Sequence, residues 1–177
     1  MRSAARWRRS TSAWRGSAKR NSALARATSE LVGRALDWAL ARRGDPSYAL
    51  RCLAFIEDAF ELANQIELFG GDTAAESAAL YRPRPYEHTR PPPAGSLVFY
   101  AASGQVNGAA RDWGHVGLAL GDGTVVHAWD VVRIDDAQDV ERLTPAMGWT
   151  APRMIGWVPA ARLLRGHRRR MWNGIGS

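Results

Sequence analysis

The sequence predicts an α+β domain in which N-terminal helices pack on a small antiparallel β-sheet. Helical apolar periodicity dominates residues 29–81, strand-like segments dominate residues 95–158, and the proline-rich stretch Pro83–Pro93 separates the two regions. Helices that precede strands in this way are typical of α+β folds rather than of alternating βαβ units. A chain of 177 residues with 46% hydrophobic content is long enough for one domain with a real core.

Basic residues gather at both ends of the chain, and these ends are predicted to lie outside the domain. Residues 1–28 predict a disordered tail, residues 29–164 a folded domain, and residues 165–177 a second basic tail. Residues 1–22 hold seven basic residues and no acidic one, so the remaining chain has 17 residues of each sign and is neutral. The N-terminal tail is therefore expected to contact anionic polymers, and no specific nucleic-acid binding is predicted.

The N-terminal tail leaves two alternatives open. Trp7 and Trp14 lie among arginines, a composition also typical of an arm that binds phosphates or a membrane surface. A start codon assigned too early would instead make the segment an artefact. No apolar segment follows that would suit a secretory signal or a transmembrane helix, so neither is predicted and the location stays open.

Cysteine usage limits the chemistry of the chain. Cys52 is the single cysteine, which excludes an internal disulfide and a metal site built from thiolates. A zinc site made of Cys52 and two histidines is the alternative to a nucleophilic site, but no carboxylate lies at a suitable spacing. We therefore expect no metal or other cofactor, and we expect a monomer.

Three helices are predicted in the N-terminal half. Apolar residues from Ser29 onward predict a helix that ends near Arg43, with Gly44 as its stop and a turn after it. Cys52–Gln65 predicts a second helix with an acidic, solvated side, and Thr73–Tyr81 a short third one.

Strands follow the prolines. Gly95–Tyr100 predicts the first strand, and Ala101–Gly114 a long loop of the kind that often carries function. His115–Trp129 predicts a hairpin, Val131–Ile134 a further strand and Ile155–Val158 the last one.

The length of the hairpin turn determines whether the side chains of its two histidines lie on the same face. A two-residue turn would place His115 and His127 on opposite faces. A three-residue loop over Gly121–Gly123 pairs 120 with 124 and 117 with 127, so the two rings share a face as diagonal neighbours. Gly123 supplies the left-handed conformation that such a loop needs, and Gly117 leaves room opposite His127.

The cysteine lies at the predicted start of a helix. Helix-end N–H groups and the neighbouring Arg51 would both stabilise a thiolate at Cys52 and lower its pKa. The alternative is a buried structural thiol, which is common for free cysteine. In the favourable hairpin register Cys52 attacks a carbonyl, His115 takes the thiol proton, and His127 fixes the tautomer of His115.

These residues resemble the NlpC/P60 cysteine peptidases, papain-like enzymes of bacterial cell-wall metabolism. PPPAGSLVFY is similar to the family's GDLVFF strand, and HVGLALGDGTVVHAW is similar to its HVGIYLGNGxFIHA hairpin, including the 12-residue histidine spacing. The resemblance implies an NlpC/P60-like catalytic domain over residues 29–164, with Cys52 as nucleophile, His115 as base and His127 as third residue. It also implies peptidoglycan stem peptides as substrates and an extracellular or cell-wall location.

The resemblance extends to the surroundings of the site, with departures. Tyr48 matches a tyrosine that the family places near the thiol, and Trp113 and Trp129 flank the histidines as substrate-binding candidates, core packing being their alternative. The family's Asp-Cys-Ser-Gly is replaced by Arg51–Ala54, and Ser96 stands for the acid of the first strand.

Four functions are therefore kept in view. The leading hypothesis is a cysteine hydrolase that cuts amide bonds in cell-wall or other small peptides. The alternatives are a non-catalytic binding module on the same fold, a related CHAP-like amidase, and a protein that binds anionic polymers through its tail.

Overall fold

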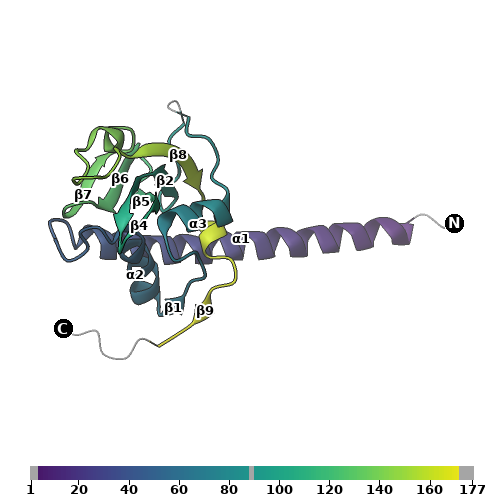
Figure 1. Cartoon of the computed structure of the whole chain (residues 1–177). Helices are drawn as coiled ribbons and strands as arrows, with labels where there is room; N and C mark the ends of the chain where they lie inside the picture. Colours follow the sequence, from purple (N-terminus) through teal and green to yellow (C-terminus); the bar gives the residue numbers. More distant parts are fainter. Residues whose placement is uncertain (1–3, 88–89, 172–177) are drawn as a thin grey trace.

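The computed structural model describes residues 4–87 and 90–171, with side chains from residue 21 onward. The α+β prediction is confirmed, because helices pack on an antiparallel sheet (Figure 1). In chain order the elements are α1 Ala4–Leu40, α2 Cys52–Asn64, β1 Ile66–Glu67, α3 Ala74–Tyr81, β2 Leu97–Ala101, β3 Ser103–Val106, β4 Ala109–Asp112, β5 His115–Ala119, β6 Thr124–Ala128, β7 Val132–Asp136, the short 3₁₀ helix η1 Asp139–Arg142, β8 Arg153–Val158, α4 Ala160–Leu163 and β9 Arg168–Arg169.

The main sheet has five strands in the order β7-β6-β5-β2-β8, and each neighbouring pair is antiparallel. Successive side chains of a strand point to opposite faces. Leu97 and Phe99 of β2 join the core beneath the helices, whereas Val98 and Tyr100 join a second apolar cluster on the other face. The sheet is thus buried on both sides, which explains why its central strands are apolar throughout.

The helices build one face of the domain. α2 packs against both α1 and the strands β5 and β6, and α3 packs against β2. The buried side of α2 comprises Phe55, Ile56, Ala59 and Phe60, while its first residue, Cys52, borders the same cluster. The packing therefore places the start of α2 next to the hairpin β5–β6.

The first helix is longer than the sequence predicted. α1 begins at Ala4, whereas residues 1–28 were expected to form a disordered tail and the helix to begin near Ser29. The N-terminal part of α1 extends away from the rest of the molecule (Figure 1). Alanine and arginine both favour helix, so the composition that suggested a tail also permits this continuation.

Two segments that were expected to be irregular contain strands. The expected loop Ala101–Gly114 forms the β3–β4 hairpin, which turns at Asn107-Gly108 with positive φ at both residues. In the expected C-terminal tail, Arg168–Arg169 pair with Ile66–Glu67 as β9 and β1. Residues 172–177 of that tail lie outside the described residues.

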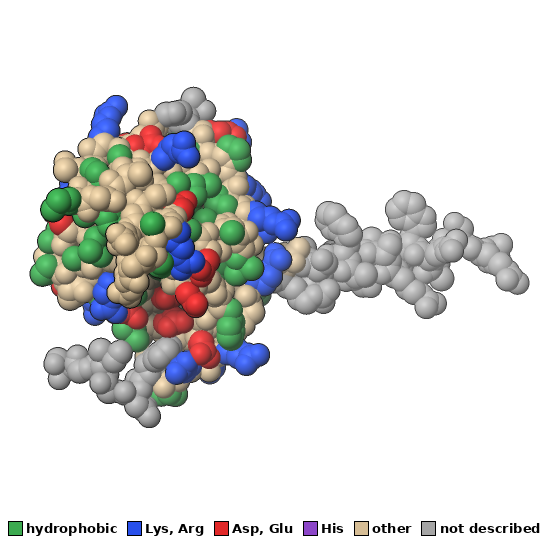
Figure 2. Space-filling view, in the orientation of Figure 1, with side chains coloured by type: hydrophobic (Ala, Val, Ile, Leu, Met, Phe, Trp, Pro, Cys, Tyr) green, Lys and Arg blue, Asp and Glu red, His purple; other side chains and the backbone are tan. Residues whose placement is uncertain are grey.

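Charges of both signs occur on the visible face of the domain, which agrees with the neutral balance predicted for it (Figure 2). In the part of the chain that the structure describes, no helix combines the length and the apolar character needed to cross a membrane.

Two glycines provide a matched test of the packing between α1 and the sheet. A Cβ at Gly95, whose φ is +78°, would lie 2.3 Å from Cγ1 of Val32, whereas a Cβ at Gly33 in α1 meets nothing within 4 Å. We expect Gly95→Ala to lower the free energy of unfolding by ~1–3 kcal/mol. Gly33→Ala should raise it by ~0.5–1 kcal/mol because alanine is the better helix former. Denaturant titrations of both variants measure these changes, and equal effects would contradict the packing described.

Candidate functional site

Of the two possible hairpin registers, the structure has the one with the three-residue loop. Gly117 pairs with His127, and the amide of Leu120 donates to the carbonyl of Thr124. The loop glycines Gly121 and Gly123 have φ values of +96° and +100°, which a side chain would disfavour. The register therefore places the rings of His115 and His127 on one face of the sheet.

The two histidines are joined in a hydrogen-bonded chain that ends on a carboxylate. Nε2 of His115 lies 2.9 Å from Nδ1 of His127, and Nε2 of His127 lies 2.9 Å from Oδ2 of Asp135. Arg133, two residues before Asp135 in β7, also donates to both oxygens of Asp135. Asp135 and Arg133 were not among the predicted site residues.

The carboxylate fixes the tautomers of both rings. Burial raises the pKa of Asp135, but hydrogen bonds from Arg133 and His127 outweigh it, and the net pKa lies below its usual range. An ionised carboxylate only accepts hydrogen bonds, so Nε2 of His127 carries the proton and its Nδ1 accepts. Nε2 of His115 must then donate to His127. The remaining Nδ1 of His115 is left with a free lone pair and can act as a base.

Burial keeps both imidazoles neutral. The side chains of His115 and His127 are almost wholly inaccessible to solvent. Burial, and then the neighbouring His127, lower the pKa of His115 well below its ordinary value. Burial also lowers the pKa of His127, although the hydrogen bond to Asp135 opposes that shift. A neutral His115 is the protonation state that a general base requires.

The neutral histidines predict a dependence of stability on pH. Their pKa values in the folded protein lie below the ordinary value of 6.5, so the unfolded chain takes up protons first as the pH falls. The histidine contribution is complete above pH ~6.5 and is lost as the pH falls towards the folded pKa values. We expect the double variant His115→Asn, His127→Asn to lose this dependence between pH ~7 and ~5 in denaturant titrations, while His167→Asn retains it. An unchanged slope in the double variant would contradict the assignment.

The nucleophile candidate begins α2, as predicted. Arg51 is the N-cap residue, and its side chain makes no capping hydrogen bond to the helix. The first N–H groups of a helix have no carbonyl acceptor within it, and the backbone of Cys52 and Leu53 contacts the thiol. Burial raises the pKa of the Cys52 thiol to about 11, although hydrogen bonds with backbone groups of Val116, Leu53 and Cys52 itself oppose this.

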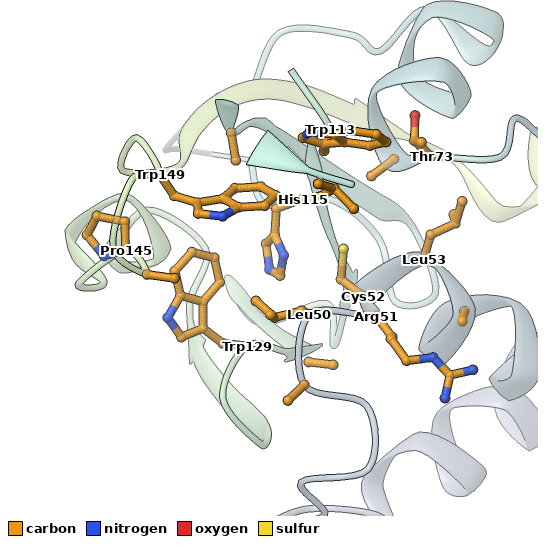
Figure 3. Close-up of a pocket in the computed structure, with 18 of the residues that line it drawn as sticks. Leu50, Arg51, Cys52, Leu53, Thr73, Trp113, His115, Trp129, Pro145 and Trp149 are labelled. Atoms are coloured by element: carbon orange, nitrogen blue, oxygen red, sulfur yellow. The ribbon is translucent and has the colours of Figure 1, made fainter. Parts of the chain in front are cut away.

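The predicted role of Arg51 beside the thiol is wrong. Its guanidinium lies 5.8 Å from the centroid of the Tyr48 ring and points away from the thiol (Figure 3). Desolvation therefore dominates at Cys52, and the thiol is protonated near neutral pH. Any activation must come from a base that removes the proton.

Cys52 and His115 face one cavity of about 640 Å³ (Figure 3). Cys52 enters it from the start of α2, and His115 enters it from the start of β5. Among the described residues, no hydrogen bond joins the thiol to the ring. The other residues lining the cavity are Ala49, Leu50, Arg51, Leu53, Ala54, Asp72, Thr73, Ala74, Ala102, Val106, Trp113, Gly114, Ala128, Trp129, Asp130, Thr144, Pro145, Ala146 and Trp149.

The three aromatic candidates have different positions. Trp113 and Trp129 both line the cavity, and Trp129 packs edge-on against His115 with ring centroids 5.1 Å apart. Tyr48 is not among the described residues that line it. Its hydroxyl donates to Asp58 at 2.6 Å and its ring packs on Trp38 and Phe55, so Tyr48 stabilises the helical core instead.

Trp149 is a third cavity tryptophan that the sequence did not single out. Its indole packs so closely on Gly104 of β3 that a Cβ at Gly104 would lie 2.2 Å from the ring. Nε1 of Trp113 donates to the carbonyl of the same Gly104. The β3–β4 hairpin therefore holds two of the three indoles, which gives the expected loop 101–114 a direct place in the site.

No protein-family model matches the chain, and no curated protein matches it. Among solved structures, the chain is similar to RipD from Mycobacterium tuberculosis, described as a non-catalytic NlpC/p60 domain protein with an adaptation to peptidoglycan-binding function. The two chains are 18% identical, the TM-score is 0.42, and the match covers 72% of this chain and 95% of RipD.

Proposed function

We propose that the protein is a cysteine-dependent hydrolase of amide bonds on a papain-like NlpC/P60 fold. The observation that supports this most is the hydrogen-bonded chain His115–His127–Asp135, which ends on a cavity shared with Cys52. A buried chain of three ionisable groups is costly to desolvate, and a purely structural role does not need the free Nδ1 that it leaves on His115.

The proposed acylation begins from a neutral pair. Sγ of Cys52 attacks the carbonyl carbon while its proton passes to Nδ1 of His115. The C–N bond then breaks as the imidazolium returns this proton to the leaving nitrogen, which departs as an amine. The acyl group remains on Cys52 as a thioester.

Deacylation uses the same groups in reverse. A water molecule attacks the thioester carbonyl and gives its proton to His115. The C–S bond breaks, a carboxylic acid leaves, and Cys52 regains its proton. During both steps the His127–Asp135 pair stabilises the positive charge on His115, which burial would otherwise oppose.

The N–H groups at the start of α2 are proposed to stabilise the developing oxyanion. No side chain caps the first N–H groups of α2. These groups also have no carbonyl acceptor within the helix. Directed at the carbonyl oxygen, they would stabilise the tetrahedral intermediate. This proposal gives Arg51–Ala54 a role through their backbone rather than through their side chains.

A second candidate is a non-catalytic binding module on the same fold. The observation that favours it is the thiol itself, because desolvation raises its pKa to about 11 and, among the described residues, only backbone hydrogen bonds oppose that shift. In that case the cavity would bind a ligand without turnover.

Alkylation by iodoacetamide at pH 7 separates the two candidates. In a hydrolase, labelling of Cys52 depends on His115, so His115→Ala should slow it by at least ~10-fold. In a binding module, wild type and His115→Ala should label equally slowly. Equal rates would exclude the hydrolase.

Digestion of purified peptidoglycan tests the substrate that the sequence resemblance implies. Cell-wall stem peptides are digested because the resemblance implies them, and mass analysis of any released fragments identifies the bond cut. Fragments that also appear with Cys52→Ala would show contamination rather than activity.

A further inference from the structure

We propose that the cavity above Cys52 selects an uncharged, apolar acyl group, so that the substrate is a hydrophobic N-acyl compound. This inference rests on the proposed function for its catalytic consequence, whereas its binding preference can be measured separately. The argument uses the cavity lining, its polar groups and its mouth.

The lining presents mainly apolar surface around the thiol. Trp113, Trp129 and Trp149 surround the cavity together with Leu50 and Pro145 (Figure 3). A volume of about 640 Å³ lies in the range that encloses a small organic ligand. Aromatic walls of this kind gain free energy chiefly by excluding water from an apolar group.

Two indole N–H groups and one hydroxyl oxygen of the lining form hydrogen bonds with the protein itself. The indole N–H of Trp129 donates to the carbonyl of Thr144, as that of Trp113 does to Gly104. The hydroxyl of Thr73 accepts the amide of Glu76 at the start of α3. A peptide backbone that extends beyond the start of α2 would therefore find these side-chain groups already engaged, and burying its own N–H and C=O groups unpaired is costly.

Charge also argues against an acidic ligand. Arg51 is the one arginine among the described lining residues, and its guanidinium points away from the cavity (Figure 3). The acidic lining residues Asp72 and Asp130 are exposed at the rim. A carboxylate such as that of a γ-D-glutamyl residue thus finds no cation inside, and an uncharged acyl group is favoured.

The mouth of the cavity carries an apolar side chain beside these two carboxylates. Leu50 is 76% exposed although it lines the cavity, and its backbone has a φ of +59°, a conformation that leucine rarely adopts. A hydrogen bond from its amide to the carbonyl of Trp129 holds it there. Leu50 thus extends the apolar lining outward, as a longer acyl chain would require.

Binding to a protein without the nucleophile tests the preference directly. Tryptophan fluorescence of Cys52→Ala is titrated with acetyl-, butanoyl- and hexanoyl-glycinamide and with the dipeptide L-alanyl-D-glutamate. We expect affinity to rise roughly fourfold for each added methylene until the cavity is filled, with the dipeptide weaker than the hexanoyl compound. Affinity that does not depend on chain length, or tighter binding of the dipeptide, would overturn the proposal.

Variants that alter the position of Trp149 test whether the ligand binds in this cavity. Gly104→Ala in the Cys52→Ala background displaces the indole of Trp149 and should weaken hexanoyl-glycinamide at least ~10-fold, as should Trp149→Ala. Gln105→Ala, exposed in the same β3 strand, is the matched control and should bind normally. Unchanged binding in both cavity variants would contradict the site. If binding follows the expected order but the wild type releases no glycinamide, the hydrolase fails and the apolar preference stands.

Discussion

Replacing His115 with alanine is expected to lower the rate of hydrolysis by ~10³-fold or more, because the protonated thiol of Cys52 then has no base. The thiol pKa of about 11 makes this dependence severe, since almost no thiolate exists at neutral pH without proton transfer. The rate constant for release of the amine from the best substrate measures the effect. Cys52→Ser should be similarly impaired.

The control for this variant is His167→Ala. His167 lies after α4, where its Nδ1 contacts the carbonyl of Leu164, and it is not among the described residues that line the cavity. Full activity in His167→Ala together with loss in His115→Ala assigns the base. Comparable activity in both variants would mean that proton transfer does not pass through His115.

The second large effect is expected for Asp135→Asn. Asparagine can donate its N–H₂ to Nε2 of His127, which would move the proton of that ring to Nδ1. Nε2 of His115 would then have to accept, and its proton would occupy Nδ1, the atom that must take the thiol proton. We therefore expect activity to fall ~10²–10⁴-fold without loss of the fold.

A structural role for Asp135 would not produce the same signature. Nitrogen chemical shifts of the histidine rings should show that the protonated atom moves from Nε2 to Nδ1 in Asp135→Asn. Asp136→Asn is the matched control, because Asp136 is exposed and its carboxylate accepts an amide hydrogen bond from Gln138. Unchanged tautomers in Asp135→Asn, with full activity, would refute the positioning role.

The fold could be predicted wherever one pattern covered a whole element. The helix from Cys52 and the short helix capped by Thr73 have the expected starts, because a turn or a capping residue precedes each. The β1–β9 pairing could not be predicted, since two residues per strand carry no periodicity. Asn107-Gly108 is a strong hairpin signal that was passed over within the expected loop.

The candidate site could be predicted in part. Spacing and loop length together place His115 against His127, because the side-chain period of a strand is two and the register follows from the turn. Asp135 lies on the next strand, and its contact with His127 depends on a second register that the sequence leaves free. Its alternation with Arg133 along β7 is the signal that could have indicated an inward-facing ion pair.

The surroundings of the thiol could not be predicted from neighbours in sequence. Arg51 is adjacent to Cys52, yet the first turn of α2 directs its side chain towards Tyr48. The hydroxyl of Tyr48 in turn donates a hydrogen bond to Asp58, more than one turn into α2, so Tyr48 does not face the cavity. Trp149 reaches the site only because the β3–β4 hairpin offers a glycine against which an indole can lie flat.

Detection of an acyl-enzyme tests most directly whether Cys52 and His115 perform acyl transfer. The protein is mixed with p-nitrophenyl hexanoate, quenched in acid at short times, and examined by intact mass and peptide mapping. We predict one hexanoyl group on Cys52 in the wild type, formed at least ~10²-fold more slowly in His115→Ala. No adduct on Cys52, or an adduct that forms equally fast without His115, would contradict the proposed mechanism.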